Sequence, residues 1–152
     1  MLIGNVSVTS IGGQVAWTNF SDKRIKDNVM NSIPGLEFIT KLQPVTFTYN
    51  LDKQYELTGQ KITSTNPYER DIEKITFSGF MAQDVEETAN KIGYDFSGID
   101  KSGTIWGLRY SDFIPSMVKS IQELNQQNKQ LKEENKRLLN SIKIIEQKLS
   151  GK

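Results

Sequence analysis

With 152 residues the chain can form one domain of ordinary size, and at 36% its apolar content is low. This composition predicts a small core, or an elongated molecule that buries surface against partner chains. The net charge of +1 gives no support for a nucleic-acid-binding or membrane-surface protein, and the absence of Cys and His excludes disulfides, Cys/His metal sites and His-based triads.

The first elements in chain order are a β-like segment and a helix. In residues 1–20 apolar positions alternate with Ser, Thr and Gly, which predicts short strands or irregular extended chain. Ser21 then occupies the position of a helix N-cap. Ile25, Val29 and Ile33 follow at four-residue spacing, and Pro-Gly at 34–35 ends the run. These features predict a helix between Ser21 and residue 34.

A helix, a strand and a long polar segment are expected next. Residues 36–42 have apolar side chains at every third position, and Pro44 ends this short helical run. The alternating sequence Val-Thr-Phe-Thr-Tyr at 45–49 predicts a strand. Residues 50–76 are polar and turn-rich, so we interpret them as a loop or pair of loops before the apolar segment 77–80.

The pattern that follows predicts a second amphipathic helix. Met81, Val85, Ala89 and Ile92 share one face, and Gly93 is placed to stop the helix. A turn at 100–103 then leads to a strand at 104–110.

The C-terminal segment carries a heptad pattern. Ser111 or Asp112 is expected to cap a long helix, with Pro115 tolerated in its first turn. From residue 114 apolar or Asn residues recur at alternating spacings of three and four, over five heptads, which predicts a coiled coil. The a positions are Ile114, Ile121, Asn128, Asn135, Ile142 and Leu149, and the d positions are Met117, Leu124, Leu131, Leu138 and Ile145.

Four segments, in order, resemble a known family: Ser-Asp-Lys-Arg-Ile-Lys at 21–26, Leu-Gln-Pro-Val-Thr-Phe-Thr-Tyr at 42–49, Gly-Phe-Met-Ala-Gln-Asp-Val at 79–85 and Tyr-Ser-Asp-Phe-Ile-Pro at 110–115. The sequence is similar to peptidase S74, the endosialidase-type intramolecular chaperone domain of phage tailspikes and tail fibres. A related domain occurs in the myelin regulatory factor transcription factors. Met81 and Asp84 are mild departures from the family pattern.

The resemblance implies an α+β fold, with a small mixed helix and strand body followed by a long helix that forms a parallel trimeric coiled coil. It implies three parts: residues 1–20 as the end of an upstream β-rich fibre, 21–112 as the chaperone body and 113–152 as the coiled-coil helix. The expected partners are two further copies of the chain and the fibre segment of the same chain. We expect no cofactor, no metal, no nucleic acid and no membrane partner.

The resemblance also implies a reaction and a location. The domain would help an upstream fibre to assemble in the host cytoplasm, and the fibre would end in a virion tail or on a cell surface. It would then cut itself off by autoproteolysis between Phe20 and Ser21. The resemblance assigns Ser21 as nucleophile and Lys26 as general base, and assigns no role to Asp22 or Arg24. Two alternatives are a non-cleaving trimerisation module of the same fold and an unrelated coiled-coil adaptor.

The chemistry of a Ser–Lys pair places two conditions on the fold. A lysine accepts a proton only when its amine is neutral, and desolvation is the main way to lower a lysine pKa from its ordinary ~10.4. We therefore expect assembly of subunits to bury Lys26. Residues five apart do not share a face of a regular helix, so Ser21 must lie at or before the N-cap, with the lysine arm folding back.

The heptad pattern and the family resemblance disagree about the number of chains. Ile at a with Leu at d, together with Asn128 and Asn135 at a, favours parallel dimers in isolated coiled coils. The resemblance implies a trimer. We expect a trimer, because the globular part before residue 113 is expected to bury apolar surface between chains and so to set the stoichiometry.

Overall fold

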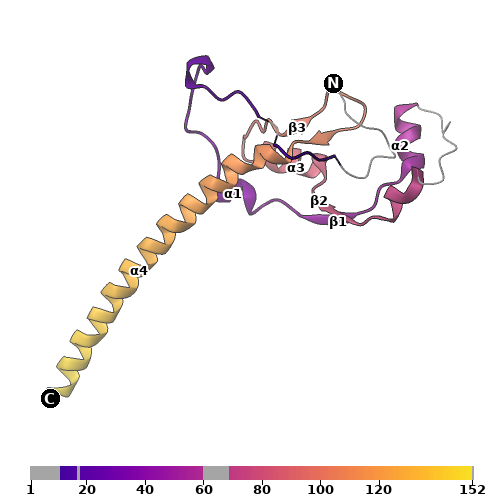
Figure 1. Cartoon of the computed structure of the whole chain (residues 1–152). Coiled ribbons are helices and arrows are strands. Elements are labelled where there is room, and N and C mark those ends of the chain that lie inside the picture. Colours follow the sequence, from indigo (N-terminus) through magenta and orange to yellow (C-terminus); the bar gives the residue numbers. More distant parts are fainter. Residues whose placement is uncertain (1–10, 17, 60–68, 152) are drawn as a thin grey trace.

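The computed structural model describes residues 11–16, 18–59 and 69–151. They form a small α+β body from which one long helix extends (Figure 1). The body contains two antiparallel pairs of short strands: β1 (Val45–Phe47) with β2 (Phe77–Gly79), and β3 (Ile99–Asp100) with β4 (Gly107–Leu108). No described helix is long and apolar enough to cross a membrane.

The segment before the body differs from the expected helix. The described residues 11–16 and 18–20 contain no helix or strand, and the predicted Val6 and Val8 region lies outside the described residues. Between Ser21 and residue 34 only one 3₁₀ turn forms, η1 (Lys23–Ile25), and its N-cap is Asp22 rather than Ser21. Asn28 then adopts a left-handed φ of 53°, which is incompatible with a continuing helix.

The middle of the chain confirms two predictions and corrects a third. The short helix α1 (Leu36–Ile39) and strand β1 lie where the sequence placed them. The polar segment after β1 was wrongly interpreted as loops, because residues 51–58 form helix α2 (Leu51–Thr58) and residues 69–74 form the 3₁₀ helix η2 (Glu69–Lys74). The expected loop residues 60–68 lie outside the described residues.

Helix α3 (Ala82–Lys91) confirms the second amphipathic helix and contributes to the core. Val85 and Ala89 are buried on its inner face, and Gly93, with φ 67°, follows its C-terminal end. Val85 and Ala89 pack in one cluster with the aromatic rings of three residues, Phe38, Phe96 and Phe113. The rings of Phe96 and Phe113 meet edge to face at 4.6 Å, the favoured geometry for aromatic pairs. The core is thus small, as the composition predicted.

The long helix α4 (Ile114–Ser150) begins differently from the prediction. A 3₁₀ turn, η3 (Tyr110–Phe113), leads into it, and neither Ser111 nor Asp112 is its N-cap; that position is held by Phe113. Pro115 lies in the first turn, as expected. With 37 residues the helix is about 55 Å long, and most of it extends away from the body (Figure 1).

Only one face of α4 is used by the body. Ser116 and Ser120 are buried there, and their small side chains let α1 approach the helix closely. The Leu36 N–H donates to the Glu123 carboxylate at 2.8 Å, which fixes the start of α1 against α4. The a and d positions at the same level lie on another face and stay 43–65% exposed: Ile114, Met117, Ile121 and Leu124.

The exposed heptad face continues to the end of α4. Leu131, Leu138, Ile142, Ile145 and Leu149 are each between 51% and 71% exposed in the single chain. This apolar stripe, interrupted by Asn128 and Asn135, exceeds the scattered exposed apolar residues of an ordinary monomer. The body therefore leaves the heptad face unpaired.

Gly35 is required by the close contact between α1 and α4. A Cβ at this position would lie 2.6 Å from Glu123 Oε2 and 2.8 Å from the backbone nitrogen of Ser120. We expect Gly35→Ala to lower the free energy of unfolding by about 1–3 kcal/mol, because backbone of α4 cannot yield as a side chain would. Thermal or urea unfolding measures this. Gly103→Ala is the control, since its Cβ would meet nothing closer than 3.7 Å; an equal loss in both variants would contradict the packing argument.

Candidate functional site: a serine–lysine pair

Ser21 and Lys26 lie together in the structure. Lys26 Nζ donates a hydrogen bond to Ser21 Oγ at 2.8 Å. The turn η1 separates the two residues, and Lys26 returns to extended backbone at its C-cap (φ −117°, ψ 120°). Ser21 lies one residue before the N-cap Asp22, so the condition that the serine precede the turn is met. The distance is within the range for proton transfer between a nucleophile and its base.

The pair is exposed in the single chain. Ser21 and Lys26 are both exposed, and Phe20, on the amino side of the expected scissile bond, is 94% exposed. In Figure 1 this segment loops away from the body before it returns at α1. In the single chain, the residues that the structure describes therefore do not bury Lys26.

Large apolar side chains surround the pair without covering it. Ile25, Val29 and Met30 are 66–76% exposed, on the same segment as Ser21 and Lys26. The sequence analysis assigned Ile25 and Val29 to the inner face of a helix. In the structure they contact no core, so this apolar surface is left unpaired in the single chain.

Asp22 and Arg24 form a contact that the sequence analysis did not predict. The Asp22 carboxylate accepts from the Arg24 side chain at 2.6 Å (Nη2) and 3.1 Å (Nε), and from the Arg24 backbone N–H at 2.8 Å. The side-chain hydrogen bond from Arg24, followed by the backbone one, lowers the pKa of Asp22 below its ordinary value. The signal in the sequence for this contact was an acidic residue two positions before Arg24, at the start of a turn.

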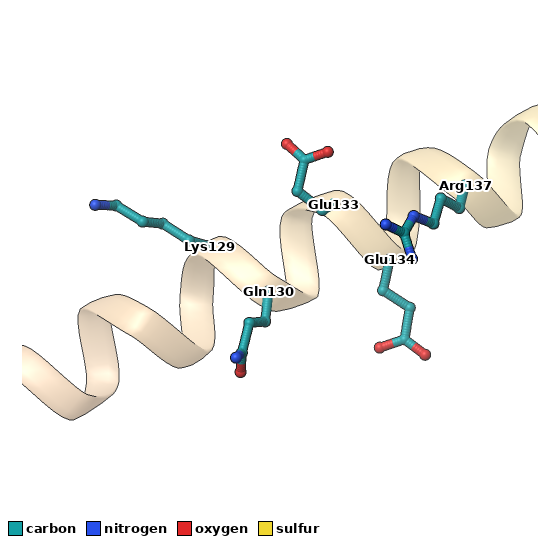
Figure 2. Close-up of a pocket in the computed structure, with 5 residues that line it drawn as sticks. All are labelled: Lys129, Gln130, Glu133, Glu134 and Arg137. Carbon is teal, nitrogen blue, oxygen red and sulfur yellow. The ribbon is translucent and has the colours of Figure 1, made fainter.

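The concave surfaces of the described chain lie on other elements than the pair. One, of about 620 Å³, is lined by residues of the body that include Tyr49, Phe80 and Trp106. Another runs along α4 and is lined by Lys129, Gln130, Glu133, Glu134 and Arg137. Figure 2 shows that these five side chains leave a single helix in different directions, so they enclose no cavity. None of them occupies an a or d position of the heptads.

Metal chemistry has no candidate ligands in the part of the chain that is described. The side chains of Asp and Glu form no group of three or more that could hold a metal ion there.

The fold and site define a class: a small α+β domain that pairs a serine with a lysine and continues into a long helix. Comparison with protein families identifies the family. The model of Peptidase_S74, the chaperone of endosialidase, matches residues 21–94. The match covers a little under half of the chain and supports the S74 resemblance that the sequence motifs predicted. No curated protein and no solved structure was found to match the chain.

Proposed function

We propose that this chain is an intramolecular chaperone that trimerises, assists the assembly of an upstream fibre and then releases itself by cutting the Phe20–Ser21 bond. The observation that carries the proposal is the 2.8 Å hydrogen bond between Lys26 Nζ and Ser21 Oγ, within a segment that matches the S74 family. The family match supports the chaperone role. The start of the match at Ser21 supports the position of the cut.

The proposed reaction proceeds in two steps. Ser21 Oγ attacks the carbonyl carbon of Phe20 through a five-membered ring, while Lys26 takes the hydroxyl proton and passes it to the leaving nitrogen. The C–N bond breaks and an ester forms, with the Ser21 nitrogen as a free amine. Water then hydrolyses the ester, which leaves a carboxylate on Phe20 and restores the Ser21 hydroxyl.

Assembly supplies what the single chain lacks for this reaction. An exposed lysine stays protonated at neutral pH and cannot act as a base. The unpaired apolar side chains of Phe20, Ile25, Val29 and Met30 would be covered by neighbouring subunits, and the same contact would withdraw Lys26 from water. Cleavage would then follow correct assembly, which is the order that a chaperone of a fibre requires.

The exposed heptad face supports association of chains through α4, and the family resemblance favours a trimer. Three copies of α4, packed through their a and d positions, would bury a stripe that the body leaves open. We expect light scattering on the intact chain to give about three times its mass of 17.3 kDa. A dimer would favour the coiled-coil adaptor instead.

The test of cleavage is mass spectrometry on freshly expressed chain carrying an upstream fibre segment. We expect two products that meet at the Phe20–Ser21 bond. A single uncut chain that nevertheless runs as a trimer would favour the non-cleaving trimerisation module, for which the exposure of Lys26 in the single chain is the supporting observation.

A further inference from the structure

The short turn between Ser21 and Lys26 has its own capping contact. Asp22 Oδ1 accepts from the Arg24 N–H at 2.8 Å, and backbone hydrogen bonds from Ile25 to Asp22 and from Lys26 to Lys23 close the turn. A side-chain acceptor at the first position of a turn satisfies an amide that the turn itself leaves unpaired. This contact therefore favours the one backbone conformation that returns Lys26 towards Ser21.

Few other contacts hold this turn. Its residues are exposed and none of them is buried against the body. A 3₁₀ turn as short as this one is only marginally stable in water without tertiary packing. The Asp22 cap is consequently a large share of what fixes the distance between Ser21 and Lys26 in the single chain.

Arg24 holds the capping carboxylate in place and compensates its charge. Its Nε lies 3.1 Å from both Asp22 oxygens and its Nη2 lies 2.6 Å from Oδ2. The ion pair is exposed, so its direct contribution to stability is small.

The other charged groups of the segment are Lys23 and Asp27. Among the described residues, Lys26 forms no ion pair with either of them or with Asp22. The charged residues of this segment besides Lys26 are thus two anions, Asp22 and Asp27, and two cations, Lys23 and Arg24. Of the four, only Asp22 and Arg24 are joined to each other by an ion pair.

We infer that Asp22 is a positioning residue for self-cleavage and that Arg24 orients and neutralises it. The inference rests on the proposed function. Asp22 holds the turn that presents the lysine amine to the Ser21 hydroxyl, and Arg24 keeps the Asp22 carboxylate in the position from which it caps that turn.

The test compares three variants of the fibre-linked chain by the rate of cleavage. Asp22→Ala should cleave about fivefold more slowly, the effect expected from a lost N-cap contact. Asp22→Asn should recover most of that rate, because the amide oxygen can accept from the same backbone N–H. Arg24→Ala should also cleave more slowly than the wild-type chain, because the capping carboxylate is then no longer held in place.

The outcomes separate the inference from the proposed function. If the wild-type chain does not cut itself, the proposed function fails and the role of Asp22 fails with it. If the wild-type chain cuts but Asp22→Asn is no faster than Asp22→Ala, the capping role alone is overturned. Cleavage of Arg24→Ala at the wild-type rate overturns the role of Arg24. Light scattering on each variant checks that assembly is unaltered, which the exposure of both side chains predicts.

Discussion

Ser21→Ala and Lys26→Ala are each expected to leave the fibre-linked chain as one uncut polypeptide. Ser21→Ala removes the attacking oxygen, and Lys26→Ala removes the amine that lies 2.8 Å from it. Loss of a nucleophile or its base typically lowers such rates by at least ~10²-fold, so cleavage should be absent on the time scale of expression. Mass spectrometry of the purified chain measures the result. Neither residue belongs to the heptad helix α4, so assembly through that helix should be retained.

Lys26→Arg separates the need for a base from the need for a positive charge. A guanidinium keeps the charge and can still hydrogen bond to Ser21, but it does not deprotonate in proteins. We expect this variant to remain uncut. Lys23→Ala is the matched control, because Lys23 is an exposed lysine of the same turn without a contact to Ser21. Cleavage by Lys26→Arg at the wild-type rate would rule out Lys26 as the base.

Leu131→Asp is expected to abolish the trimer. Leu131 is a d position and is 56% exposed in the single chain, so a charge there costs little to an isolated α4. In a parallel trimer three carboxylates would meet in the apolar seam. Each chain would lose about 1.5–3 kcal/mol of leucine burial, and desolvation of the like charges would add to the cost. Light scattering should then report the mass of one chain.

Gln130→Asp is the control for this substitution. Gln130 is the preceding residue of the same helix, occupies a c position and is also exposed, as Figure 2 shows. Gln130→Asp introduces the same charge outside the apolar seam formed by the a and d positions, so the trimer should persist. If the two variants behaved alike, the heptad face would not be the contact between chains.

The same pair of variants tests whether assembly and cleavage are coupled. If neighbouring subunits must bury Lys26, Leu131→Asp should stop cleavage although it lies far along α4 from Ser21. Gln130→Asp should cleave normally. Full cleavage by a monomeric Leu131→Asp chain would show that the single chain is already competent.

Elements with a strong periodic pattern and clear ends could be predicted from the sequence alone. Helix α3 has a full apolar face and a glycine at its end, so local pattern and final packing agree there. The five heptads of α4 predict a long helix, and that helix is present. Helix α2 carries weaker signals: Asn50 caps it, Leu51 and Tyr55 are its buried pair, and Gly59 ends it. These signals are readable in retrospect, but the surrounding polar sequence obscured them.

The site was only partly readable from the sequence. The motif identified Ser21 and Lys26, yet the helix expected between Ser21 and residue 34 does not form. Periodicity places Ile25 and Val29 on one face, but a short helix needs a surface to pack against, and the body offers none there. The chain instead makes one 3₁₀ turn, capped by Asp22.

The sequence by itself thus determined the family motifs, the heptad helix and the two residues, Ser21 and Lys26, that we propose as the reactive pair. The tertiary structure decided which face of α4 the body covers and how the serine and lysine meet. The first outcome depends on a contact between distant segments, Gly35 against Ser120. The second depends on one backbone turn, in which the Asp22 carboxylate accepts a hydrogen bond from the Arg24 amide. Local propensity carries no information on the first and only a weak signal for the second, because the energy of each contact arises only when the partners are in place.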